Sequence, residues 1–271
     1  MNDETPVLSL TTHAGRAHAV GPSVVAAVEM AERLGMRCVL AICEEAAAAL
    51  PDSVGKMIAN GRLIVYHFDR DLGVNMKWFP ARRLYPEAPL VCIDDDRIYR
   101  DGTIRALLDA AERFPEDFLC CAWRRLFVDD TGATAPYALG GEKKAVLHTG
   151  LEVEEPTLLP PGRFVVEHWA ACLHPPGFGL GYETEAVLYA PKDDDSFLSA
   201  LMARHGRTCR VVPLAESPCK RDLMREGDPG TKAFFKETAL GNQRRDGWAR
   251  TAAVIASYER DFRRARERKT A

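Results

Sequence analysis

The chain of 271 residues lacks the patterns that would mark it as a membrane, secreted or zinc-binding protein. No apolar run approaches the length of a membrane-spanning helix, and the acidic segment 1–6 has no apolar stretch typical of a secretion signal. The eight cysteines form no Cys-x-x-Cys pair, and several lie inside apolar runs, which argues against zinc and against a disulfide framework. We therefore expect a soluble, cytoplasmic protein with reduced, buried cysteines.

Two common phosphate-binding motifs are also missing. No Gly-x-Gly-x-x-Gly follows the first predicted strand, and no glycine-rich loop ends in Gly-Lys-Ser/Thr. The net charge is −3, so the composition gives no reason to expect nucleic acid as a partner. Any phosphate group of a substrate would have to be neutralised by a metal ion or by side chains.

The first half of the chain contains an alternation of strand and helix patterns. Short apolar runs typical of buried strands occur at residues 6–12, 36–42, 62–67, 90–93 and 118–123. Helical patterns separate them at residues 21–34, 44–59, 74–85 and 102–114. This order predicts an α/β fold with a mostly parallel central sheet flanked by helices. Later strands are predicted at residues 163–169, 186–189 and 208–213, and a helix at 248–268.

We interpret residues 1–271 as a single domain with three parts. The parts are a nucleotide-binding half (1–125), an acceptor half (126–215), and a C-terminal loop and helix (216–271). Residues 129–161 are rich in Gly, Pro, Thr and Glu and are predicted to form loops that could cover an acceptor. The C-terminal helix ends in a basic run. A solvated helix end favoured by the dipole explains that run, and peripheral docking to anionic lipid at the inner membrane face is the alternative.

Three carboxylates, Asp94, Asp95 and Asp96, directly follow the strand predicted at 90–93. Open α/β sheets bind ligands just outside the carboxyl ends of their strands. Two such charges about 4 Å apart repel by roughly 4 kcal/mol at an effective dielectric near 20. A hard divalent cation, Mg²⁺ or Mn²⁺, would offset that repulsion. Alternation along an extended segment directs Asp94 and Asp96 to the ligand and Asp95 to the other side. A solvated acidic turn is the alternative.

A second run of acids, at residues 193–195, opens a helix whose apolar stripe is Phe197, Leu198, Leu201 and Met202. Acids at a helix N-terminus interact favourably with its dipole, and a single capping Asp would satisfy that need. Three acids in a row are more than capping requires. We therefore predict a functional role for at least one of them.

Five segments in consistent order resemble motifs of bacterial glycosyltransferases of the GT-A superfamily, family 2-like. These segments are residues 9–16 (Ser-Leu-Thr, then Arg), 77–86 (Lys to Tyr-Pro), 92–99 (Asp-Asp-Asp), an Arg at 125 with Pro-Tyr at 136–137, and 194–198 (Asp-Asp at a helix start). The resemblance covers residues 6–205 and implies a nucleotide-diphospho-sugar transferase fold.

The resemblance assigns roles to individual residues. Asp94 and Asp96 would bind a Mn²⁺ or Mg²⁺ ion. The nucleotide-sugar donor would contact Thr11, Arg16, Lys77, Asp94 and Asp95. Asp195, with Asp194 beside it, would remove a proton from the acceptor hydroxyl.

The function predicted in this way is metal-dependent transfer of a sugar from a nucleotide-sugar donor to a hydroxyl acceptor, in cell-surface glycan or polysaccharide synthesis. One alternative is a non-catalytic nucleotide-sugar-binding or scaffold protein, because Glu185 and Ala186 stand where the family has glycines. Another is a metal-dependent nucleotidyltransferase, although the expected Gly-rich basic N-terminal loop is absent. Trp169 is predicted to be a core aromatic or a sugar-stacking residue, and neither His168 nor His174 is predicted to bind the metal.

Overall fold

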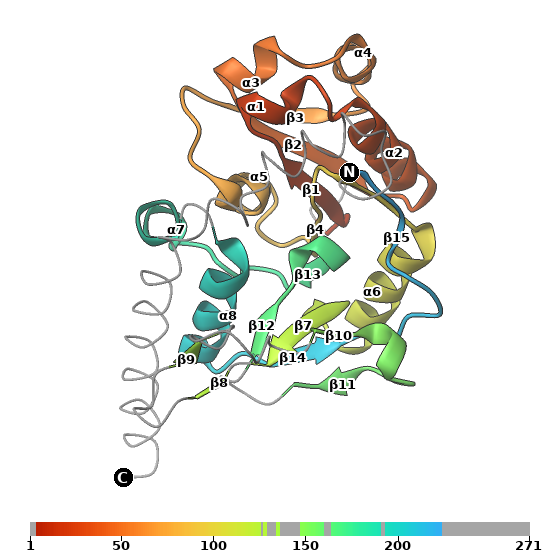
Figure 1. Ribbon diagram of the computed structural model, residues 1–271, viewed down its shortest axis with the longest axis vertical. Coiled ribbons are helices and arrows are strands. Elements are labelled where there is room, and N and C mark those ends of the chain that lie inside the picture. The colour runs from red at the N-terminus through yellow and green to blue at the C-terminus, as the bar shows by residue number, and fades with distance from the viewer. Residues whose placement is uncertain are drawn as a thin grey trace.

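The computed structural model describes residues 4–125, 127–128, 134–135, 147–159, 164–190 and 193–223. Its central sheet has eight strands in the order β11-β14-β6-β13-β4-β1-β2-β3 (Figure 1). Their bounds are β1 Val7–Thr11, β2 Arg37–Cys43, β3 Ile64–Phe68, β4 Leu90–Cys92, β6 Phe118–Cys120, β11 Thr157–Leu158, β13 Cys172–His174 and β14 Cys209–Val211. Three smaller sheets pair β10 (Leu147–Thr149) and β12 (Phe164–Val166) with β7 (Ala122–Arg125), β15 (Cys219–Asp222) with β5 (Arg97–Tyr99), and β8 (Phe127–Val128) with β9 (Thr134–Ala135).

Six of the eight strands run in one direction. The pairs β1–β2, β2–β3, β1–β4 and β6–β14 are parallel. Strand β13 is antiparallel to both of its neighbours, β4 and β6, so these two run the same way. The carboxyl ends of the parallel strands therefore share one edge of the sheet, and the amino end of β13 lies at that same edge. The mostly parallel sheet predicted from the sequence is confirmed.

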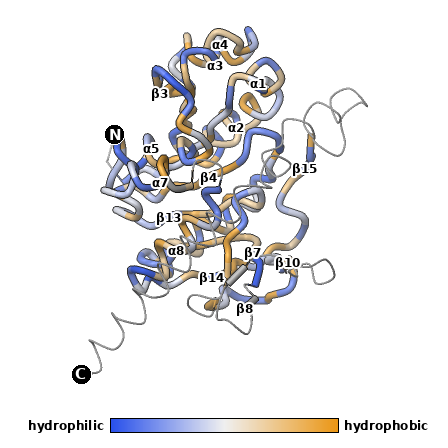
Figure 2. The backbone as a smooth tube through the Cα atoms, turned by 60° about the vertical axis from the view of Figure 1, so that its left-hand side comes forward, coloured by the Kyte–Doolittle hydropathy of each residue, from blue (hydrophilic) through white to orange (hydrophobic). Residues whose placement is uncertain are grey.

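Helices cover both faces of this sheet, as Figure 1 shows. One core contains Leu8, Leu40 and Val91 together with the apolar stripes of α2 (Gly21–Arg33), α4 (Asp52–Ala59) and α6 (Asp101–Arg113). The other core lies on the opposite face, against α5 (Phe79–Leu84), α7 (Glu183–Tyr189) and α8 (Asp194–His205). Successive strand residues point to opposite faces, so strands buried on both sides must be apolar throughout. Figure 2 shows this as hydrophobic stretches along the strands in the interior.

Most predicted elements are present with shifted ends. The segment 74–85 is a 3₁₀ turn, η1 (Val74–Lys77), followed by α5, and the first strand is followed by a short helix, α1 (Ala14–Ala17). Residues 44–59 form α3 (Glu44–Ala48) and then α4. In the predicted loop region 129–161, a 3₁₀ turn, η2 (Gly150–Glu152), follows β10. Of the strand predicted at 163–169, only the part that forms β12 (Phe164–Val166) is confirmed. The chain then forms the 3₁₀ turn η3 (His168–Ala170).

Two expectations fail or cannot be followed. The strand predicted at 186–189 is wrong, because these residues belong to helix α7. A run of four residues is too short for periodicity to separate strand from helix. The predicted helix at 248–268, with its lipid contact, lies outside the described residues. Among the described residues, no helix is both long enough and apolar enough to cross a membrane.

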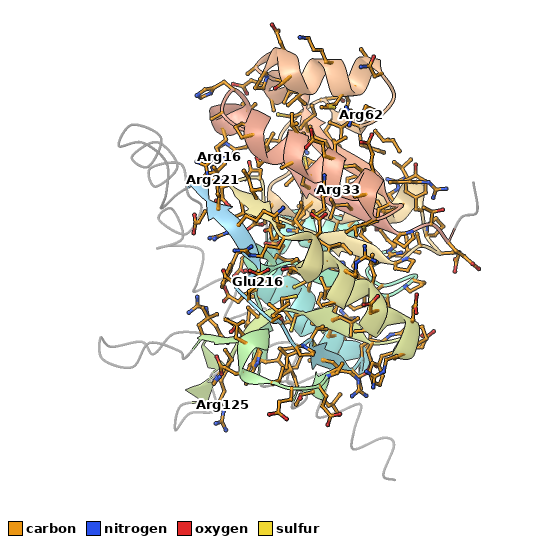
Figure 3. All side chains as sticks on the ribbon, turned by 90° about the vertical axis from the view of Figure 1, so that its right-hand side faces the viewer. Arg16, Arg33, Arg62, Arg125, Glu216 and Arg221 are labelled. Atoms are coloured by element: carbon orange, nitrogen blue, oxygen red, sulfur yellow. The ribbon has the colours of Figure 1, made fainter. Side chains whose placement is uncertain are left out.

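Surface ion pairs contribute little to holding α2 in place. Arg33 of α2 pairs with Asp101 at 2.7 Å, and Arg62 pairs with Glu32, also of α2, at 2.5 Å (Figure 3). All four side chains are about one-third to one-half exposed, and solvent screens ion pairs of this kind, so they add little to stability. The buried apolar stripe of α2, against β1, β2 and β5, carries the packing.

Candidate active site

The three acids after β4 each contact a basic side chain. Nη1 of Arg16, from α1, lies 2.8 Å from Asp95 Oδ1 and 3.3 Å from Asp96 Oδ2. Nε of Arg97 lies 3.6 Å from Asp96 Oδ1. The ammonium of Lys77 lies 2.5 Å from Asp94 Oδ1. The repulsion within the triplet is therefore offset by three cations of this chain.

Lys77 connects the triplet to the start of α8. Its Nζ donates to Asp94 Oδ1 at 2.5 Å and to Asp194 Oδ2 at 2.9 Å, and its backbone carbonyl accepts a hydrogen bond from Ser9 Oγ. Burial lowers the pKa of Lys77, but Asp194 and Asp94 outweigh burial and raise it well above its usual value. Burial likewise raises the pKa of Asp94, and Lys77 outweighs it, so that the pKa of Asp94 falls. Both groups are charged near neutral pH.

The alternation expected for the triplet does not occur. Strand β4 ends at Cys92, and Asp95 and Asp96 lie in a turn rather than in an extended segment. Asp95 and Asp96 consequently share Arg16, while Asp94 alone contacts Lys77. Burial, and then the charges of Asp94 and Asp95, raise the pKa of Asp96 to about 7.

Two carboxylate oxygens of the triplet fit a cation. Asp95 Oδ2 and Asp96 Oδ1 are buried and accept no hydrogen bond. Buried carboxylate oxygens without donors are unfavourable by themselves and are the ligands that Mg²⁺ and Mn²⁺ prefer. Asp96, one of the two metal ligands predicted from the sequence, is thus suited to that role. Asp94, the other, is already neutralised by Lys77.

A tyrosine joins the triplet to η3. The backbone N–H of Asp94 donates to the hydroxyl of Tyr99 at 3.0 Å, and that hydroxyl donates to the carbonyl of Trp169 at 3.0 Å. Burial, and then Asp94, raise the pKa of Tyr99 well above its usual value, so the hydroxyl keeps its proton. Trp169 packs partly against the core and carries the guanidinium of Arg97 at 4.9 Å from its ring centroid.

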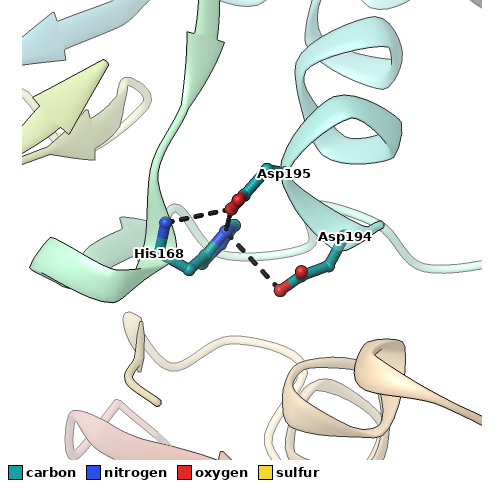
Figure 4. A group of neighbouring side chains, drawn as sticks. All are labelled: His168, Asp194 and Asp195. Carbon is teal, nitrogen blue, oxygen red and sulfur yellow. Dashed lines mark hydrogen bonds and ion pairs between the residues drawn. The ribbon is translucent and has the colours of Figure 1, made fainter. Parts of the chain in front are cut away.

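A histidine and an aspartate form a close pair at the start of α8 (Figure 4). Nδ1 of His168 lies 2.6 Å from Asp195 Oδ1, and the backbone N–H of His168 donates to the same oxygen at 2.9 Å. Asp195 lies in the first turn of α8. The N-cap of this helix is Asp193, and the carboxylate of Asp193 accepts a hydrogen bond from the Ser196 N–H at 3.1 Å. The structural need for a cap is met by Asp193, which leaves Asp194 and Asp195 for other contacts.

The same pair belongs to a group that could hold an ion. His168, Asp194 and Asp195 offer ligand atoms that all lie within 4.8 Å of one another, and among the described residues this is the group of three with that geometry. Within it, the 2.6 Å separation of His168 Nδ1 and Asp195 Oδ1 is a hydrogen-bond length. A cation here would have to replace that bond.

The residue before His168 is also acidic. Glu167 pairs with Arg124 and accepts from Trp169 Nε1 at 2.8 Å. Burial, and then the charge of Asp195, raise the pKa of Glu167 to about 7.

The structure brings nearly all predicted site residues to one edge of the sheet. Arg16, Lys77, the Asp94–Asp96 triplet and the Asp194–Asp195 pair form one network of contacts, and Thr11 lies at the end of β1, where its hydroxyl donates to the carbonyl of Ala41. Among the described residues that contact this network without being predicted as site residues are Arg97, Tyr99, His168 and His174. The alternation Arg-Ile-Tyr after the triplet could have indicated the first two, whereas nothing in the sequence places the histidines.

Comparisons with known proteins support the fold. No family model matches the chain, and no curated protein matches it. The structure of 4-diphosphocytidyl-2C-methyl-D-erythritol synthase from Anaerococcus prevotii DSM 20548 is similar, with a TM-score of 0.51 at 10% identity over 90% of this chain and 100% of that one. CMP:2-keto-3-deoxy-manno-octonic acid synthetase complexed with CTP gives a TM-score of 0.49 at 12% identity over 89% of this chain and 100% of that one.

These identities limit what the likeness means. The first comparison, at 10% identity, shows a shared fold and nothing more. The TM-score of the second, 0.49, is too low to add support. The GT-A type α/β fold predicted from the sequence is confirmed. The closer resemblance to family 2-like glycosyltransferases is matched by no family model.

Proposed function

We propose that the chain is a transferase that takes a group from a nucleotide-activated substrate and moves it to a hydroxyl acceptor. The observation that carries the proposal is the position of Asp195. Its carboxylate is held by two donors of His168, at the same sheet edge as a cluster of cations and of carboxylate oxygens that accept no hydrogen bond. A hydroxyl nucleophile has a proton to lose, and a fixed carboxylate within hydrogen-bond reach can accept it.

The opposite side of the network suits the phosphates of the substrate. Arg16 and Arg97 place guanidinium groups beside the triplet. Asp95 and Asp96 would hold a divalent ion through Asp95 Oδ2 and Asp96 Oδ1, which accept no hydrogen bond, and such an ion stabilises negative charge on a departing phosphate oxygen. Lys77 fixes the distance between the triplet and α8, and thereby between the substrate phosphates and the base.

The comparison gives more support to nucleotidyl transfer than to glycosyl transfer. The similar enzyme with a TM-score above one-half is named as the synthase of a diphosphocytidyl compound. Nucleotidyl transfer would consume a nucleoside triphosphate and release pyrophosphate. The sequence also allows this reaction, as the enzymatic alternative to glycosyl transfer.

Glycosyl transfer is the second candidate, and the order of motifs favours it. Lys77, the triplet and the Asp194–Asp195 pair occupy one site in the order that resembles the glycosyltransferases. This reaction would consume a nucleotide sugar and release a nucleoside phosphate. With a hydroxyl acceptor, both reactions would use the base in the same way.

Product analysis separates the two. The full chain is incubated with Mg²⁺ or Mn²⁺ and either the four ribonucleoside triphosphates or a panel of UDP-, GDP-, CMP- and dTDP-sugars, with a mixture of sugar acceptors. Pyrophosphate release identifies nucleotidyl transfer, and release of a nucleoside phosphate identifies glycosyl transfer. No nucleotide binding by calorimetry with either ion would contradict the transferase proposal and favour a scaffold role.

The metal assignment has its own test. Asp96→Ala is expected to abolish the ion-dependent part of nucleotide binding, because it removes a free oxygen donor. Asp109→Ala, an exposed acid on α6, is the matched control and should bind as the wild type does. Nucleotide affinity that is insensitive both to Asp96→Ala and to EDTA would show that no ion is held there.

A further inference from the structure

A second buried histidine contacts the proposed base through His168. His174, the last residue of β13, is fully buried, and its ring packs against Phe118 and Phe178 with centroids 4.6 and 5.8 Å away. Its Nε2 lies 3.1 Å from Nε2 of His168, and its Nδ1 makes no hydrogen bond. Asp195, His168 and His174 therefore form a continuous line of contacts from the base into the core.

We infer that His174 is a positioning residue, which donates a hydrogen bond from Nε2 to His168 and so fixes the tautomer with which His168 holds Asp195. The role of Asp195 as base rests on the proposed function. The hydrogen-bond direction rests on the geometry of the three side chains.

Counting protons gives the direction of the bond. Two ring nitrogens 3.1 Å apart share one hydrogen, so one ring donates and the other accepts. Burial, and then His168, Arg82 and Lys77, lower the pKa of His174 well below its usual value, so the ring is neutral and carries one proton. If that proton were on Nδ1, a buried N–H would have no acceptor and would lose its full solvation. The proton on Nε2 avoids this cost and points at His168.

The consequence reaches the carboxylate. Because His168 Nε2 accepts this hydrogen bond, it carries no proton, and the proton of the His168 ring lies on Nδ1, which faces Asp195 Oδ1 at 2.6 Å. The side chain and the backbone N–H of His168 then both donate to that one oxygen and hold the carboxylate in one orientation. A histidine whose far nitrogen is hydrogen-bonded has its tautomer and ring orientation fixed in the same way in many metal sites.

Nuclear magnetic resonance tests the tautomers without any substrate. The full chain is labelled with ¹⁵N-histidine, and long-range ¹H–¹⁵N correlations report which ring nitrogens carry protons. Spectra of His168→Gln and His174→Gln assign the two residues among the seven histidines. We expect His174 to be protonated on Nε2 and His168 on Nδ1. Any other pattern overturns the inference, whether or not the chain proves to be a transferase.

Two variants test the consequence for catalysis. His174→Phe keeps an aromatic ring between Phe118 and Phe178 but removes the donor. His174→Gln keeps an amide donor but removes the ring. If donation matters, the kcat of the Phe variant falls roughly 10- to 100-fold with KM for the nucleotide unchanged, and the Gln variant regains most of it. Wild-type kcat in the Phe variant, or an equal fall in both variants, assigns the residue to packing and overturns the inference.

Discussion

Replacing Lys77 by methionine would leave two acids without their shared cation. The side chain of Lys77 is 6% exposed, that of Asp194 is 4% exposed and that of Asp94 is 28% exposed. Methionine has a similar length and is apolar, so Lys77→Met removes the charge with little change in packing. We expect a large loss of stability, because Asp194 in particular has little access to water that could replace the ammonium.

The magnitude follows from the distances. At an effective dielectric near 20, charges 2.5 and 2.9 Å apart attract by about 6 kcal/mol each, and desolvation of the ions offsets most of this gain. Removing one partner of a buried pair leaves the desolvation uncompensated, which typically costs about 3–5 kcal/mol. For a chain of this size, that corresponds to a fall in melting temperature of at least about 6 °C.

Urea unfolding at neutral pH measures the loss. Lys56→Met, at an exposed position of α4, is the matched control and should stay within about 0.5 kcal/mol of the wild type. The double variant Lys77→Met/Asp194→Asn should regain much of the loss, because it removes the more buried of the two unpaired charges. A loss below about 1 kcal/mol for Lys77→Met, or no recovery in the double variant, would refute the reasoning.

The pH dependence provides a second check of the same contact. Lys77 lowers the folded pKa of Asp94 below its ordinary value of 3.8, so the stability from this contact is present above that value and is lost as the pH falls through the lower folded pKa. The penalty of Lys77→Met should therefore be largest near neutral pH and should shrink as the pH falls below 3.8, where the contact between Lys77 and Asp94 loses its stabilising effect.

Three further variants test other parts of the site. Asp195→Asn should lower kcat by roughly 10²–10⁴-fold while nucleotide affinity by calorimetry stays within about threefold, because it removes a base and not a phosphate contact; an active variant contradicts this. Glu167→Gln should flatten the dependence of the unfolding free energy on pH between about 4.5 and 7. The folded pKa of Glu167 is raised from 4.5 to about 7, so the stability contributed by the protonated carboxyl group is lost as the pH rises through that range. An unchanged pH profile contradicts this. Tyr99→Phe should cost about 1–3 kcal/mol in urea unfolding, since it leaves the Asp94 N–H and the Trp169 carbonyl unpaired inside the protein; a loss under about 0.5 kcal/mol contradicts this.

The sequence predicts the parallel part of the fold well, because the physics there is local. Apolar runs such as 36–42 and 90–93 are bounded by charge, proline or helical periodicity, and each becomes a strand of the sheet. Strand β13 is different. It has only three residues, Cys172–His174, and its place between β4 and β6 is set by contacts with strands about 50 and 80 residues away. No local pattern indicates such a pairing.

In the candidate site, too, the features set by local sequence could be predicted and those set by long-range contacts could not. The acids at the ends of β4 and the start of α8 were predicted because strand ends and helix starts are visible in the sequence. Their partners were not, since Lys77 meets Asp194 across 117 positions and His168 reaches Asp195 only because η3 precedes β13. The orientation of Asp95 was predicted incorrectly because the alternation rule applies to extended backbone, and the chain turns directly after Cys92.

The short strand β13 sets the face on which each of its side chains lies. Cys172 is opposite both Cys92 and Cys120, which places Cys172 and His174 toward α8 and Leu173 toward α6. One residue inserted between η3 and β13 would reverse this arrangement, because side chains alternate strictly along a strand. Leucine would then face the interior where the imidazole now stands, and histidine would enter the opposite, fully apolar layer. A single added amino acid between η3 and β13 would thus separate the two histidines and disturb both cores at once.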